Sequence, residues 1–259
     1  NHEGNSVDIY EDPQEDHYYC ITVDTSRGIG GDYSAFVVFD ITEMPYKVVA
    51  KYRNNKIAPM LYPNVIAKVG QDYNNAFVLI ENNDIGGQVV EILHEEIEYD
   101  NIFSTVTEKS RQYVSPGFGK STRLGVNTSK QVKRQGCFNF KSLMEEKKLL
   151  VFDADIIAEI STFVEKGNTY QADEGYNDDC VMCMVLFGWL STMPFFKELV
   201  DVNTREGLYK QEMQSISQNL TPFVMRKSNE EAPAWVAGGD YWLMDDEYSK
   251  RLKESKFKY

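Results

Sequence analysis

Acidic residues stand at three points of the 259-residue sequence where they could act together. Asp24 ends an apolar, β-branched run, Glu81 ends a second one, and the pair Asp178–Asp179 precedes a strongly apolar stretch. Carboxylates that meet at the ends of strands are unfavourable unless a cation neutralises them. Because oxygen ligands without a histidine cluster favour Mg²⁺ or Mn²⁺ over Zn²⁺, these acids predict a hard-metal site.

Such a site predicts a particular chemistry. Two ions about 4 Å apart can activate water and stabilise the leaving oxygen in phosphodiester cleavage. Asp24 suits the position between the ions, with Glu81 on one ion and a member of the Asp178–Asp179 pair on the other. Helix neighbours differ by about 100°, and both faces of this helix are apolar, so periodicity does not choose between Asp178 and Asp179. Each acid also has a plain structural explanation, as a turn residue, a loop exit or a charge at a helix N-terminus.

The elements that must position these acids follow from the apolar periodicity. We expect an antiparallel meander of strands over 18–23, 35–39 and 46–52, a helix over 59–73, a buried strand over 76–80, a helix over 86–96 and a possible strand over 102–106. We then expect a helix over 140–147, a strand over 149–152, and helices over 154–166 and 178–192, the last with Asn177 as its N-cap. This order predicts a mixed α/β layered domain.

The predicted domain limits are a polar, acidic lead-in over 1–17, the main domain over 18–220 and a C-terminal appendage over 221–259. Within the main domain, 103–135 is expected to be a basic loop or hairpin. No run of about 18 apolar residues occurs, so we expect no transmembrane helix and no membrane partner. The polar start is not that of a signal peptide, and its lack of an initiator Met is expected of a fragment or a processed chain.

The charge is unevenly distributed along the chain. A net charge of −13 argues by itself against a nucleic-acid partner. However, residues 104–148 hold ten basic and three acidic residues, a net +7 against −20 for the remainder. This split predicts a phosphate-binding surface on an acidic body, with a solvated loop of incidental charge as the alternative. The expected DNA contacts are Lys120, Arg123, Lys130, Lys133 and Arg134, together with Arg27 in the glycine-rich turn 25–32.

Two further motifs favour plain interpretations. Cys180 and Cys183 have C-x-x-C spacing, but no second cysteine pair or histidine cluster accompanies them, so we expect buried thiols in a reducing compartment. The run Gly117-Phe-Gly-Lys-Ser-Thr122 looks like a phosphate loop. The full pattern needs glycine where this chain has Val114, so we expect a loop that brings Lys120 to DNA phosphates and no ATP site.

Three motifs together resemble one family. They are Ile21-Thr-Val-Asp-Thr-Ser-Arg-Gly28 with Gly31-Asp-Tyr33, then Val78-Leu-Ile-Glu-Asn82, then Glu174-Gly-Tyr-Asn-Asp-Asp-Cys-Val-Met182. Their order and spacing, over roughly 18–192, resemble the nuclease domain of large terminase subunits from tailed phages of the T-even type. The resemblance implies an α/β fold of the ribonuclease H-like type, a mixed sheet flanked by helices.

The resemblance also implies an activity and a ligand set. It implies an endonuclease that cuts concatemeric viral double-stranded DNA during genome packaging, with little sequence preference and with Mg²⁺ or Mn²⁺ in a two-ion site. The family's metal ligands fall on Asp24, Glu81 and Asp179. Its auxiliary acid, eight residues after the first ligand, falls on Asp32, and Asp178 is kept as a further candidate ligand. Asn177 stands where the family often has His.

The implied partners are DNA, the portal, the packaging ATPase domain and the small terminase subunit, in the host cell cytoplasm. The ATPase domain itself is expected to be absent from this chain. Two alternatives stay open: a junction resolvase or transposase-like nuclease of the same fold, and a non-catalytic module that binds DNA or docks on the motor.

Overall fold

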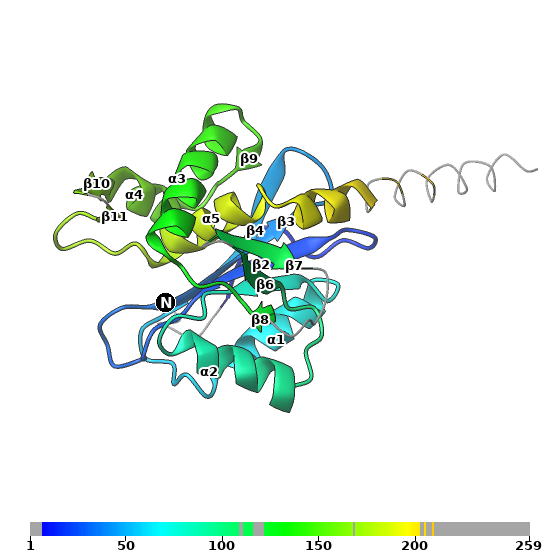
Figure 1. The fold of residues 1–259 in the computed structure, drawn as a ribbon, viewed down its shortest axis with the longest axis horizontal. Coiled ribbons are helices and arrows are strands. Elements are labelled where there is room, and N and C mark those ends of the chain that lie inside the picture. The colour runs from blue at the N-terminus through cyan, green and yellow to red at the C-terminus, as the bar shows by residue number, and fades with distance from the viewer. Residues whose placement is uncertain are drawn as a thin grey trace, which may run out of the picture. The chain divides into compact units, whose positions relative to one another are not determined.

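A six-stranded mixed sheet forms the centre of the computed structural model (Figure 1). The structure describes residues 7–108, 111–115, 122–167 and 169–202, together with Arg205 and Tyr209. Strands β2 (Tyr19–Asp24), β3 (Ser34–Asp40) and β4 (Tyr46–Asn54) form the predicted antiparallel meander, and β5 (Phe77–Ile80) joins β2 in parallel. At the opposite edge, β4 pairs with the short strands β1 (Asp8–Ile9) and β9 (Leu149–Leu150).

The central strands are apolar on both faces because helices cover both faces. In β3, Ala35, Val37 and Phe39 belong to one core cluster, while Phe36 and Val38 belong to the other. Successive side chains of a strand point to opposite faces, so a strand buried on both sides reads as a continuous apolar run. This explains why the runs that end at Asp24 and Glu81 were recognisable in the sequence.

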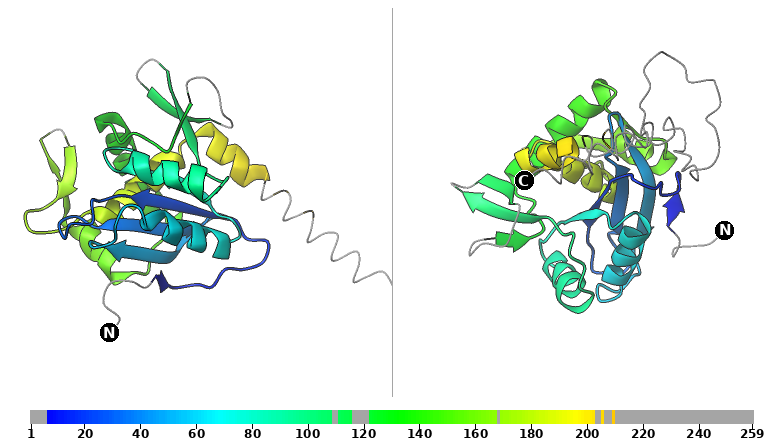
Figure 2. Two further views of the ribbon diagram at one scale, coloured as in Figure 1. Left: turned by 90° about the horizontal axis from the view of Figure 1, so that it is seen from below. Right: turned by 90° about the vertical axis from the view of Figure 1, so that its right-hand side faces the viewer.

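The helices form layers on the two faces of the sheet, as the views in Figure 2 show. One face is covered by α1 (Tyr62–Asp72) and by α2 (Gly86–Glu91) with its π-helical continuation η1 (Ile92–Glu96). The other face is covered by α5 (Asp179–Leu190), which packs on β2 and β3, and by α3 (Lys130–Glu145) and α4 (Ala154–Thr162), which pack on α5. The predicted mixed α/β architecture is therefore confirmed.

Helix α5 is the centre of the second layer, and all of its residues are buried. Its ring of Phe187 stacks on Phe39 of the sheet, with 4.0 Å between ring centroids. On its far side α3 approaches so closely that a Cβ added at Gly188 would lie 2.5 Å from the carbonyl oxygen of Gly136. A Cβ at Gly136 would lie 2.4 Å from the carbonyl oxygen of Val185. The two glycines therefore allow α3 and α5 to cross in backbone contact.

The region expected to be a basic loop or hairpin over 103–135 has more regular structure than that. Strands β6 (Ser104–Glu108), β7 (Arg111–Ser115) and β8 (Thr122–Leu124) form a separate three-stranded sheet. Helix α3 begins at Lys130, so the prediction that it begins at 140 was wrong. Ser129 caps α3 by accepting the N–H of Val132, and the buried positions continue through Gly136. A glycine and many basic residues had hidden this helical pattern.

The predicted helix over 154–166 and the predicted lead-in need revision, and the C-terminal appendage is not described. The helix expected over 154–166 ends at Thr162, and the hairpin β10 (Phe163–Lys166) and β11 (Thr169–Ala172) follows it. The lead-in 1–17 contributes strand β1 to the sheet. Residues 221–259, Lys120 and most of 203–220 lie outside the described residues.

Within the described residues, no single helix is long and apolar enough to cross a membrane. By length and composition alone, the bent pair of helices Asp179–Leu190 and Pro194–Val202 passes the same test, but the first of them is buried within the fold.

The contact between α3 and α5 predicts the effect of a single methyl group. Gly188→Ala places a Cβ against the backbone of α3, so the helices must separate, and we expect a loss of about 1–3 kcal/mol in the free energy of unfolding. Urea denaturation measures it. Gly31→Ala is the control, because nothing lies within 4 Å of its added Cβ. Equal stability of the two variants would contradict the packing described.

Candidate active site

The parallel pairing of β2 and β5 places Asp24 beside Glu81. Val23 pairs with Ile80 in the register, and the N–H of Glu81 donates to the carbonyl of Val23 at 3.0 Å. Val23 and Ile80 both point into the core under α1 and α2. The next residue on each strand therefore points to the opposite face, toward α5. Sequence position alone had predicted two strand ends, and the register brings them to one edge and one face.

Residues that pair across neighbouring strands form a row that runs from Glu81 and Asp24 to Arg53. Asp24 pairs with Ala35 on β3, and Ala35 pairs with Arg53 on β4. Asp179, the first residue of α5, reaches this row from above the sheet. Its Oδ2 lies 3.8 Å from the guanidinium of Arg53, and its charge acts on Asp24. Asp179 is thus set between the acidic and the basic ends of the row.

Negative charge accumulates at this point. Burial, and then the charge and hydrogen bond of Glu81 and the charge of Asp179, raise the pKa of Asp24 well above its usual range. The carboxylates of Asp24 and Glu81 repel each other when both are ionised. The N–H of Thr25 donates to Asp24 Oδ1 at 2.8 Å and opposes the rise. Without a cation, Asp24 therefore favours its protonated form.

Asp179 is buried, with 6% of its surface exposed. Its Oδ1 accepts the N–H of Tyr33 at 3.0 Å, while its Oδ2 is buried and accepts no hydrogen bond from any described residue. Burial raises the pKa of Asp179 to about 6, against the lowering effects of the Tyr33 N–H and Arg53. A buried carboxylate oxygen without a donor is a position that a cation would satisfy.

The structure separates the two members of the acidic pair. Asp178 occupies the N-cap position of α5, and its Oδ2 accepts the N–H of Ala172 in β11 at 3.2 Å. Asp179, and not Asp178, is the residue whose charge raises the pKa of Asp24. Asp32 is exposed in the glycine-rich turn, and its charge contributes to the raised pKa of Asp179. Asn177 is exposed, and the prediction that it caps α5 was wrong.

The N-terminus of α5 is capped instead from another helix. Glu159 of α4, 6% exposed, accepts the N–H groups of Cys180 and Val181 at 2.9 and 3.0 Å with one carboxylate oxygen. Its other oxygen lies 3.3 Å from the guanidinium of Arg53. Arg53, stacked 4.0 Å above the Tyr33 ring, therefore links the residue that caps α5 to the residue that begins it.

Arg53 and Glu159 were not among the site residues predicted from the sequence. The signal for the first was two cations, Lys51 and Arg53, two residues apart in the largely apolar run 48–53, which puts both on one face. Lys51 is 2% exposed and donates to Asp153 and Asp155 at the start of α4, at 2.9 and 2.8 Å. Lys51 and Arg53 thus both hold α4, which in turn caps α5.

The backbone behind Glu81 is also fixed. A Cβ added at Gly86, the first residue of α2, would lie 1.8 Å from the carbonyl oxygen of Glu81. The side chain of Asn83 donates to Glu81 Oε1 at 2.8 Å. The turn after β5 therefore depends on a residue without a side chain, and Gly86 was not singled out in the sequence.

The three acids are suitable ligands for a divalent cation, but their side chains are not arranged around one point. Within the described part of the chain, no three Asp, Glu, His or Cys side chains already surround one point as metal ligands. Asp24 and Glu81 face each other, and Asp179 keeps a buried oxygen without a donor. A divalent ion would offset the repulsion between Asp24 and Glu81 and satisfy that oxygen of Asp179, after side-chain rotation at the same edge.

The predicted DNA contacts do not gather in one place. Arg27, beside the site in the glycine-rich turn, pairs with Asp84 at 2.7 Å, with both side chains exposed. Arg123 is exposed on β8. Lys130 and Arg134 are exposed on α3, where Lys133 is half-buried, and Lys120 lies outside the described residues.

The cysteines of the C-x-x-C motif are core residues. Cys180 and Cys183 are fully buried in α5 and are not joined by a disulfide bond. Burial raises the pKa of both thiols. The prediction of buried thiols is confirmed.

The central meander, the parallel β5, the helices on both faces and the acids at one sheet edge define the ribonuclease H-like class. The chain belongs to the terminase RNaseH-like domain family, whose model matches residues 21–187. The resemblance noted in the sequence is thereby confirmed at the level of the family.

Solved structures agree with this fold. The large terminase nuclease of the thermophilic phage G20c with bound magnesium is similar at a TM-score of 0.54 and 23% identity, over 70% of this chain and 85% of that chain. The same nuclease with bound cobalt gives 0.53 and 24%, with the same coverage. The large terminase nuclease domain of Thermus phage P74-26 gives 0.52 and 22%, over 70% and 84%.

The capping role of Glu159 predicts a large effect on stability. Glu159→Ala removes the acceptor of two buried N–H groups and the partner of Arg53, so we expect unfolding to become easier by about 2–4 kcal/mol. Chemical denaturation measures this change. Glu91→Ala, an exposed glutamate of α2, is the matched control. A loss no greater than that of the control would remove Glu159 from this role.

The raised pKa of Asp24 predicts a pH-dependent stability without metal. Unfolded Asp24 ionises near pH 4, whereas the folded residue holds its proton to higher pH, so wild-type stability falls as the pH rises through this window. Asp24→Asn lacks that loss. In EDTA, we expect its melting temperature to exceed that of the wild type increasingly from pH 5 to pH 8. A constant difference across this range would show that Asp24 ionises alike in both states.

Proposed function

We propose that this chain is a metal-dependent endonuclease that cuts double-stranded viral DNA during genome packaging. The observation that carries the proposal is the meeting of Asp24, Glu81 and Asp179 at one sheet edge, with a buried oxygen of Asp179 lacking a donor. Family membership supports the packaging role. The magnesium and cobalt named for the phage G20c nuclease support a divalent ion here.

Each acid has a distinct part in the proposal. Asp24, central in the row and next to both other acids, would hold two Mg²⁺ or Mn²⁺ ions, with Glu81 on one ion and Asp179 on the other. Bound ions would supply Lewis-acid activation of water and stabilise the leaving oxygen. Tyr33 and Arg53 orient the carboxylate of Asp179. Asp32 and Asp178 are auxiliary acids at the rim of the site.

Among the described residues, the basic side chains proposed to hold DNA lie on the glycine-rich turn, on β8 and on α3 rather than in one cluster. We propose phosphate contacts by Arg27, Lys120, Arg123, Lys130, Lys133 and Arg134. Because phosphate contacts carry little sequence information, they suit a nuclease with little sequence preference. The portal, the small terminase subunit and a packaging ATPase domain would be its partners in the host cytoplasm. The proposed domain extends over 18–220, with 1–17 as lead-in and 221–259 as appendage.

Cleavage of supercoiled plasmid in Mg²⁺ or Mn²⁺ tests the proposal. We expect the wild type to nick and linearise the plasmid, and EDTA to stop it. Asp24→Asn, Glu81→Gln and Asp179→Asn should each lower the rate more than about 100-fold, the largest loss typical of groups that merely support a ligand. Asp72→Asn, an exposed carboxylate on α1, should cut as the wild type does.

The outcomes separate the alternatives. Cutting that survives Asp24→Asn would show that the acids are not the metal site. Cutting of branched junctions far faster than linear duplex would favour a resolvase. A folded protein that binds DNA and cuts neither substrate would favour a non-catalytic module.

A further inference from the structure

A groove on the surface lies away from Asp24, Glu81 and Asp179. A groove of about 760 Å³ is lined by strand β7, helix α3, the hairpin β10–β11 and the C-terminal end of α5. Figure 1 shows α3 beside this hairpin. The groove includes Trp189, which lies ten residues and about 15 Å along the α5 axis from Asp179. None of the three acids lines it.

The groove is basic in a chain that is acidic overall. Arg111 comes from β7, Arg134 and Lys141 from α3, and Glu165 is the acid among the lining residues. All four are exposed. Since the whole chain carries a net charge of −13, this local excess of positive charge would attract a polyanion against the general field.

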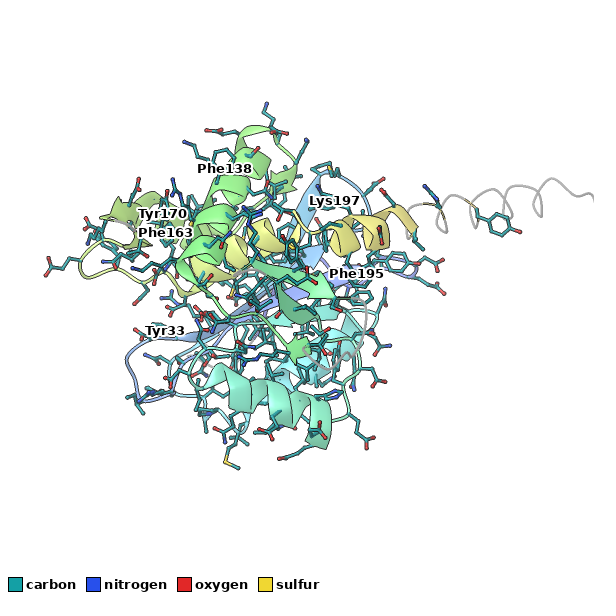
Figure 3. All side chains as sticks on the ribbon, viewed as in Figure 1. Tyr33, Phe138, Phe163, Tyr170, Phe195 and Lys197 are labelled. Carbon is teal, nitrogen blue, oxygen red and sulfur yellow. The ribbon has the colours of Figure 1, made fainter. Side chains whose placement is uncertain are left out.

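Aromatic rings stand between these cations. Arg134, Phe138 and Lys141 are spaced i, i+4 and i+7, which puts them on one stripe of α3. Phe138 is 78% exposed, and Tyr113 across the groove is 39% exposed. Tyr170, on the opposite wall, belongs to the hairpin that faces α3. Figure 3 shows Phe138 on α3 and Tyr170 on this hairpin.

The hairpin β10–β11, which forms another wall of the groove, also combines aromatic rings with a neighbouring cation. The rings of Phe163 and Tyr170 stack at 6.4 Å between centroids. Lys133 of α3 places its Nζ 5.8 Å from the Phe163 ring. The hairpin is thus held against α3 through rings and cations.

We propose that this groove binds an unpaired strand of DNA. Exposed rings stack on bases with little regard to sequence, and basic side chains contact the phosphates that follow. In a duplex, the base faces are covered by neighbouring pairs except at the ends. A groove of this volume, within the roughly 300–1,000 Å³ typical of small-ligand sites, has room for bases but not for a double helix.

The role of the groove rests on the proposed nuclease function, but its binding does not require metal. Near a cutting site, it would hold a strand end released from the duplex. Binding is therefore measurable in EDTA, where the proposed cutting cannot occur.

Fluorescence anisotropy with a labelled 20-nucleotide oligo(dT) tests the proposal on the full chain in EDTA. We expect binding that Phe138→Ala weakens about 5- to 150-fold, the loss of one stacked base. Phe152→Ala, which removes a ring 65% exposed outside the groove, is the matched control and should bind as the wild type does. Phe138→Trp should retain binding.

The charges are tested by salt dependence. The double variant Arg134→Gln and Lys141→Gln should weaken binding and make the salt slope shallower by about 0.7 for each lost phosphate contact. Lys68→Gln, an exposed lysine on α1, should leave the slope unchanged. A relaxed, covalently closed duplex circle, which has neither ends nor an unpaired loop, should bind with no dependence on Phe138.

Three results would overturn the inference. They are wild-type affinity in Phe138→Ala, equal dependence of duplex and oligo(dT) on Phe138, and displacement of oligo(dT) by poly-glutamate at equal charge concentration. The last would assign the groove to an acidic protein. If any of these occurs while plasmid cutting depends on Asp24, the strand groove fails and the nuclease stands. If oligo(dT) binding depends on Phe138 but no plasmid is cut, the groove stands and the nuclease fails.

Discussion

Repulsion among Asp24, Glu81 and Asp179 is the interaction around which this end of the fold is organised. The parallel register of β2 and β5 sets the first two side by side, and α5 adds the third from above. Without a cation, the raised pKa of Asp24 favours its uncharged form, while the N–H of Tyr33 and the guanidinium of Arg53 offset the charge of Asp179. Each of these is weaker than the neutralisation that a bound divalent ion would provide.

The rest of the second layer holds that arrangement in place. Lys51 anchors the start of α4, and Arg53 holds Glu159 further along the same helix. Glu159 then caps α5, which begins at Asp179. Because each step uses a buried charge with a partner on another element, loss of one partner would leave an uncompensated charge. The position of Asp179 thus depends on two strand residues that do not belong to the proposed ligand set.

The elements that depend on a local pattern of apolar residues could be predicted from the sequence. The runs ending at Asp24 and Glu81 were recognisable because strands covered on both faces are continuously apolar, and the uniform apolarity of 179–190 indicated a buried helix. Features that depend on contacts between residues distant in sequence could not be predicted from the residues alone. The choice of Asp179 over Asp178 came from family resemblance, and the pairing of Arg53 with Glu159 crosses more than a hundred residues. The start of helix α3 was predicted ten residues too far along the chain, because α3 contacts α5 through glycine, which gives no apolar signal.

Anomalous diffraction from Mn²⁺-soaked crystals tests the central claim most directly, because it locates the ion without relying on activity. The account predicts one or two peaks within about 2–2.5 Å of carboxylate oxygens of Asp24 and of Glu81 or Asp179. Asp24→Asn crystals should lose or weaken these peaks. Well-occupied peaks elsewhere, with none at these three acids, would contradict the account.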